Sequence, residues 1–125
     1  MLNYSTVGLT NTIMTDNQFF ALYVAGSLTR AYLNGVLWYN NLIDSYSPDY
    51  GAIAVTNEYT GSPYYLSDGF HIGPLSAAIN RGIGTPPQPP DIDGESRDNN
   101  GPPDLGADEY DGPPARRVYL PLIGN

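Results

Sequence analysis

The chain has 125 residues, which is enough for one domain and too few for two of ordinary size. Its formal net charge is −8, and this excludes a protein that binds along nucleic-acid phosphates. It has no cysteine, so disulfides and thiolate metal sites are excluded, and no run reaches the roughly 18 apolar residues of a membrane span.

The composition indicates strands and turns. Charged residues make up only 14% of the chain, too few for long amphipathic helices, whereas Gly and Pro contribute 14 and 12 residues. Eleven tyrosines, with Thr, Val and Ile in residues 1–80, suit pleated and half-buried surfaces. We therefore predict an all-β protein.

Three asparagines recur at a constant spacing, each 23 residues after the last, and each is followed at the same offset by an apolar or aromatic residue. They are Asn11, Asn34 and Asn57, followed by Ile13, Val36 and Tyr59. Such a period is close to one coil of a right-handed parallel β-helix. We predict about three coils in residues 1–82, with the asparagines hydrogen-bonded from coil to coil in a structural ladder.

Four runs of alternating or β-branched residues supply the strands of these coils. They are FFALYV (19–24), LTRAYL (28–33), GVLWYN (35–40) and GAIAVT (51–56).

The segment DIDGESRDNNGPPDLGADEY, residues 91–110, concentrates acidic residues around one arginine. In one interpretation Arg97 pairs with Asp104 and Glu109 and the segment covers the open end of the coils. The nearby prolines stiffen the connections and remove amide donors. We predict that residues 83–110 form this acidic, Pro/Gly-rich cap.

A second interpretation of this segment is a calcium site. Asp91, Asp93 and Asp104 offer the hard oxygen ligands that Ca²⁺ prefers. The DIDG sequence is similar to the beginning of an EF-hand loop, but Pro102 stands at the twelfth position, where that loop needs Glu. We predict no cofactor, with calcium in a site that is not an EF-hand as the alternative.

A third interpretation is catalysis. Glycoside hydrolysis needs paired carboxyl groups beside a sugar-binding groove, and about three coils leave little length for one. His71 is the only histidine, and no Ser or Cys nucleophile motif lies beside it. We predict that the chain is not an enzyme and assign no catalytic residue.

Residues 111–125 form a separate tail that contains RRVYLPLI. We predict a strand that folds back on the coils or adds to a neighbouring molecule by β-augmentation. The residues assigned to assembly are Val118, Tyr119, Leu120, Leu122 and Ile123.

Two motifs resemble the C-terminal part of bacterial secreted right-handed parallel β-helix proteins of the choice-of-anchor Q type. GFHIGPLSAAINRG, residues 69–82, is similar to the family segment G-[DY]-[FY]-H-L…S-x-A-I-D-x-G, and residues 91–109 are similar to D-x-D-G-x-x-R followed by D-I-G-A-x-E. The matching residues are Gly69, Phe70, His71, Ile72, Ser76, Ala78, Ile79, Gly82, Asp91, Asp93, Gly94, Arg97, Asp104, Gly106, Ala107 and Glu109. Asn80 stands where the family has Asp, which weakens any ion pair there. The resemblance implies a fold and an extracellular or cell-surface setting, but no activity.

The predicted function is that of a non-catalytic structural or surface protein, such as an appendage or filament subunit. It would assemble through open coil edges and the terminal strand, with further copies or the continuation of a longer chain as partners. The alternatives are a carbohydrate-binding module and a fragment of a polysaccharide lyase or hydrolase. Eight aromatic residues would stack on glycans if they lay exposed in a row, and otherwise pack between coils: Tyr32, Trp38, Tyr39, Tyr46, Tyr50, Tyr59, Tyr64 and Tyr65.

Overall fold

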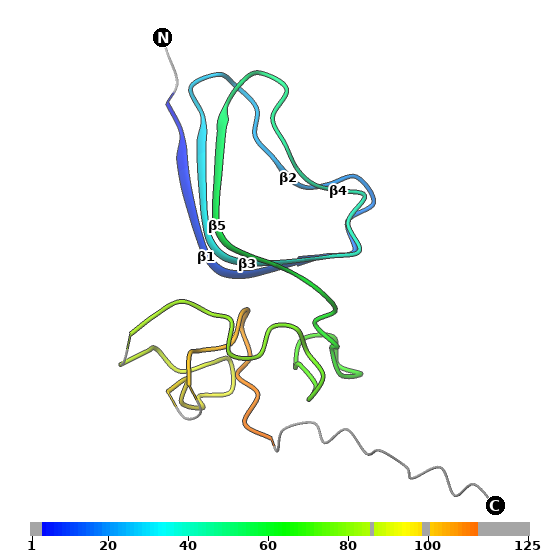
Figure 1. Ribbon diagram of the computed structural model, residues 1–125, viewed down its shortest axis with the longest axis vertical. Coiled ribbons are helices and arrows are strands. Elements are labelled where there is room, and N and C mark those ends of the chain that lie inside the picture. The colour runs from blue at the N-terminus through cyan, green and yellow to red at the C-terminus, as the bar shows by residue number, and fades with distance from the viewer. Residues whose placement is uncertain (1–3, 86, 99–100, 113–125) are drawn as a thin grey trace, which may run out of the picture.

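The computed structural model describes residues 4–85, 87–98 and 101–112, and within these ranges the protein is all-β, without a helix (Figure 1). The prediction of an all-β protein is thus confirmed. The strands are β1 (Thr6–Thr15), β2 (Phe20–Tyr23), β3 (Arg30–Tyr39), β4 (Ile43–Tyr46) and β5 (Ala52–Thr60). In this part of the chain there is also no helix that could cross a membrane.

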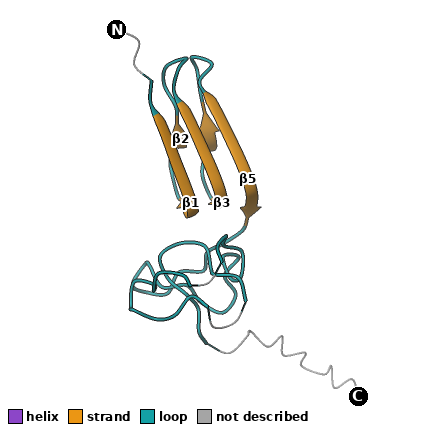
Figure 2. Ribbon diagram, turned by 90° about the vertical axis from the view of Figure 1, so that its left-hand side faces the viewer, coloured by secondary structure: helices purple, strands orange, loops and turns teal. Residues whose placement is uncertain are grey.

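The strands form two parallel sheets. One has the order β1-β3-β5 and the other pairs β2 with β4. Figure 1 shows the β1–β2 and β3–β4 units following nearly the same path, and Figure 2 shows β1, β3 and β5 side by side. The chain therefore passes from one sheet to the other and returns one strand further along.

The third passage is incomplete in the described part of the chain. β5 is the third strand of the first sheet, but no third strand follows it in the second sheet, which ends with β4. Beyond Thr60 the described residues form loops, with one isolated bridge between Tyr65 and Ile72. Strands thus occupy residues 6–60, a shorter range than the 1–82 predicted for coils.

In the middle of each long strand, one residue has the left-handed backbone conformation. Asn11, Gly35 and Asn57 have φ values of 52°, 74° and 52°. The pairing register brings them to the same position, because Thr10 pairs with Asn34 and Asn34 pairs with Thr56. Asn and Gly are the residues that adopt positive φ most readily, so the sequence places a kink at the same level in all three strands.

The kink changes which side chains point inward. Before it, Ala31 and Leu33 of β3 are buried in the space between the two sheets, and after it Val36 and Trp38 take their place. Strict alternation would have continued from Leu33 to Gly35 and Leu37. Leu37 instead faces the other way and is fully buried in a second cluster, under the loops.

The loops pack against the side of the sheet. Ile13, Leu37 and Tyr59 are register partners in β1, β3 and β5, and all three belong to the second cluster, with Leu105 and Ala78 of the loops. Figure 1 shows the loops outside the sheets, below the bend of the long strands. The sequence suggested a cap over the end of the coils, whereas the described loops cover one face across all three levels.

We expect Gly35→Ala to destabilise the protein by about 2 kcal/mol or more. A Cβ at Gly35 would lie 2.8 Å from Asn11 Oδ1 and 3.2 Å from Ile83 and Leu105 side chains, at a φ that alanine avoids. Gly8→Ala is the matched control, because Gly8 has no positive φ and open space around it. Urea unfolding of Gly8→Ala should agree with the parent within about 0.5 kcal/mol. Equal stability of the two variants would contradict this account of the kink.

Candidate functional site

The buried carboxylates of the acidic segment accept hydrogen bonds from backbone amides. Asp104 is 1% exposed, and its two oxygens accept from Asn80 N and Tyr110 N, both at 2.7 Å. Asp108 accepts from Ile72 N at 2.7 Å. Burial raises the pKa of Asp104 and of Asp108, and the backbone hydrogen bonds oppose this rise. These side chains satisfy loop amides that have no strand partner.

Asp91 organises the turn at the beginning of the same segment. Its Oδ1 accepts from Asp93 N and Glu95 N at 2.9 and 2.8 Å, and its Oδ2 accepts from Glu109 N at 3.1 Å. Burial acts to raise the pKa of Asp91, but the three amide hydrogen bonds outweigh it and the pKa is lowered. Asp91 thus joins the two ends of the acidic segment while ionised.

Arg97 lies within the segment, as predicted, but its contacts are unequal. Nη1 is 3.6 Å from Glu109 Oε2, and Nη2 donates to the Ala107 carbonyl at 2.6 Å. Asp104 makes no ion pair with it within 4.0 Å and instead accepts backbone amides. Burial raises the pKa of Glu109 to about 7, and the opposing effect of the guanidinium is smaller.

His71 links two loops through its two ring nitrogens. Nδ1 is 2.5 Å from Asp68 Oδ2, and Nε2 is 2.6 Å from Asp93 Oδ2. These hydrogen bonds raise the pKa of His71 to about 9, and the bond to His71 lowers the pKa of Asp68 to about 2. At neutral pH the imidazole is therefore a cation between two carboxylates, a role that the sequence did not suggest.

Two of the three residues proposed for calcium come together. Asp91, Asp93 and Glu95 have carboxylate oxygens within 4.8 Å of one another, as do the ligand atoms of His71, Asp93 and Asp108. Asp104 belongs to neither group. Because Asp91 is engaged by three amides and Asp93 by His71, these groups have structural partners already. Calcium binding stays a prediction.

The asparagine ladder differs from the one that the 23-residue spacing suggested. Asn57 Nδ2 donates to Asn34 Oδ1 at 2.7 Å. Asn11 instead pairs with the backbone of Ile83, donating to its carbonyl at 2.7 Å and accepting from its amide at 2.6 Å. The kinked residue of β3 is Gly35, so Asn34 lies one position before the place that Asn11 and Asn57 occupy.

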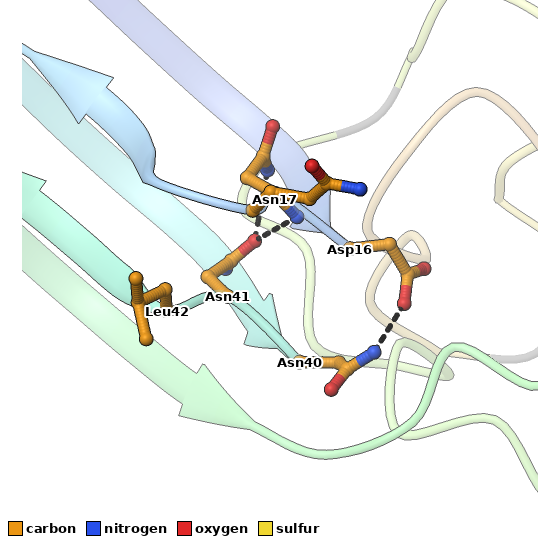
Figure 3. A pocket seen from close by; sticks show the side chains of 6 residues that line it. Asp16, Asn17, Asn40, Asn41 and Leu42 are labelled. Carbon is orange, nitrogen blue, oxygen red and sulfur yellow. Dashed lines mark hydrogen bonds between the residues drawn. The ribbon is translucent and has the colours of Figure 1, made fainter.

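A second set of polar residues stacks where the chain leaves β1 and β3. Asn40 Nδ2 donates to Asp16 Oδ1 at 2.6 Å, and Asn17 Nδ2 donates to Asn41 Oδ1 at 2.8 Å (Figure 3). Together with Gln18 and Leu42, these residues line an open hollow of about 550 Å³. The bonded partners here are 24 residues apart, one more than the spacing of Asn11, Asn34 and Asn57.

The eight aromatic residues considered for glycan stacking are divided between the interior and the surface. Trp38 is 2% exposed, and its Nε1 donates to Glu58 at 2.8 Å. Tyr59 lies partly buried with Arg81 over its ring. Tyr46 is exposed and stacks on Phe20 at a centroid distance of 5.1 Å, so its ring face is covered by another ring. The remaining predicted aromatics are exposed: Tyr32, Tyr39, Tyr50, Tyr64 and Tyr65.

The tail residues assigned to assembly, Val118, Tyr119, Leu120, Leu122 and Ile123, lie outside the described residues. In comparisons with known proteins, no family model, no curated protein and no solved structure matches the chain.

We expect the free energy of unfolding to fall as the pH rises from 4.5 to 9. The folded-state pKa of Glu109 is raised from 4.5 to about 7, so its contribution is present below pH 4.5 and lost as the pH rises through 7. The folded-state pKa of His71 is raised from 6.5 to about 9, so its contribution is present below pH 6.5 and lost as the pH rises through 9.

Two variants separate these windows in urea unfolding at a series of pH values. Glu109→Gln should flatten the slope in the lower window, and His71→Gln should flatten it in the upper one. Each variant serves as the control for the other. An unchanged slope in the matching window would show that the group is not perturbed as the geometry indicates.

Proposed function

We propose that this chain is the closing part of a right-handed parallel β-helix of the choice-of-anchor Q type, acting as a non-catalytic structural protein at a cell surface. It assembles through the open edges of its coils, with further copies of the chain as partners. The β1–β2 and β3–β4 passages and the incomplete third passage, which begins with β5, are the coils of this proposal.

The proposal rests on apolar side chains that are only partly covered in the two outer strands. Leu33, in the middle strand, is 2% exposed, whereas its register partners Leu9 in β1 and Val55 in β5 are only partly buried. The strand order leaves the outer edges of β1 and β5 unpaired among the described residues. Unpaired edges beside uncovered apolar side chains favour the addition of further strands.

The charge distribution supports contact between like chains. No residue of β1 or β2 is charged, and β5 contains only Glu58. Most of the acidic residues lie in the loops beyond β5. Repulsion from the net charge of −8 therefore acts mainly away from the strand edges.

The buried carboxylates favour a structural role over catalysis. Asp91, Asp104 and Glu109 are buried and accept backbone amides, so these carboxylates position loops and are shielded from a substrate. The rival, a carbohydrate-binding module, would need exposed aromatic faces in a row, and Trp38 and Tyr59 do not supply them.

The test is light scattering over a wide concentration range, with lysines placed on the two edges. Gly8 and Ala54 both pair with Tyr32 and so occupy the same position at opposite ends of the sheet. Gly8→Lys or Ala54→Lys should weaken assembly by at least about tenfold, because an edge lysine opposes strand addition. Leu75→Lys, at an exposed loop position, is the control and should leave the mass unchanged.

A parent protein that stays monomeric at every concentration would overturn the proposal. Oligomers that neither edge variant weakens would also overturn assembly through the edges. Deleting residues 115–125 in the parent then tells whether the tail is responsible for such oligomers.

A further inference from the structure

We propose that the hollow lined by Asp16, Asn17, Gln18, Asn40, Asn41 and Leu42 binds a neutral carbohydrate through its hydroxyl groups. The proposal is independent of edge assembly, because none of these residues belongs to a strand. A volume of about 550 Å³ lies within the roughly 300–1,000 Å³ typical of small-molecule sites.

Four of the six residues that line the hollow are held in place by bonds between the two levels. Asp16 accepts from Thr15 Oγ1 and Asn40 Nδ2, both at 2.6 Å. Asn41 Oδ1 accepts from the amide and side chain of Asn17, and Asn41 Nδ2 donates to Met14 O at 2.9 Å. Figure 3 shows the Asp16–Asn40 and Asn17–Asn41 pairs side by side, and each pair joins a residue that follows β1 to one that follows β3. Such fixed groups bind a ligand without a large loss of side-chain entropy.

Several polar atoms of the hollow keep free hydrogen-bonding capacity. No described hydrogen bond engages Asn40 Oδ1, Asn17 Oδ1 or the side-chain amide of Gln18. Asp16 carries one bond on each carboxylate oxygen, which leaves a further lone pair on each. Acceptors thus outnumber donors, and a ligand rich in hydroxyl groups offers both kinds of partner.

The charges of the hollow disfavour anions and hard cations as ligands. No Lys or Arg lines it, so a phosphate or carboxylate ligand would find no cation. Asp16 is its only carboxylate, and hard cations such as Ca²⁺ prefer several oxygen ligands in a closed shell. A neutral polar ligand matches the remaining groups.

One apolar side chain lies among the polar groups of the hollow. Leu42 lines the hollow and is 69% exposed. Sugar rings present C–H surfaces as well as hydroxyls, and the Leu42 side chain offers an apolar contact for them.

The test is an NMR titration of ¹⁵N-labelled protein with cellotetraose, mannotetraose and xylotetraose. At least one of them should give saturable shifts in the side-chain NH₂ signals of Gln18 and Asn40. Gln18→Ala and Asn40→Gly should each weaken this binding by about fivefold to tenfold, as expected for the loss of one hydrogen bond.

The control variant is Asn57→Gly. Asn57 and Asn40 have the same φ of 52°, and each donates through Nδ2 to a residue of the preceding level, but Asn57 lies outside the hollow. It should leave the titration unchanged. The proposal is overturned if no tetrasaccharide shifts these signals at millimolar concentration, or if Gln18→Ala and Asn40→Gly bind as the parent does.

Discussion

The left-handed residue in the middle of each long strand is the constraint on which the rest of the structure depends. It shifts the alternation of β3 by one residue, so that Val36 and Trp38 continue the interior that Ala31 and Leu33 begin. The same shift turns Leu37 outward and provides an apolar surface for the loops. Without it, one face of the sheet would lack a covering and the loops would lack a core.

The acidic segment is the polar counterpart of this apolar contact. Loops that form no regular sheet still contain amide groups that must be satisfied when buried. Asp104, Asp108 and Glu109 accept those amides, and Asn11 does the same for the Ile83 backbone. Burial removes water from the Glu109 carboxylate and raises its pKa, and the hydrogen bond from the Asp104 amide opposes this rise.

The sequence predicted the class of the fold but only part of the site. Composition and alternation were sufficient for an all-β chain, and the spacing of Asn11, Asn34 and Asn57 indicated a repeat. A single period could not show that Gly35 occupies the kink of β3, because both Asn and Gly adopt positive φ. The Asn11–Ile83 pair spans 72 residues, and no local pattern reveals which distant backbone a polar side chain will meet.

The loops pack on the side of the stack and not on its end, so the number of levels can change without moving the place where the loops attach. Ile13, Leu37 and Tyr59 anchor the loops through side chains on one face of the sheet, across the three levels that are present. A tandem duplication that inserted another passage before β1 would therefore lengthen the molecule while leaving these three side chains in place under the loops. Such an architecture can vary in size by copying its repeating unit while its loop region stays constant.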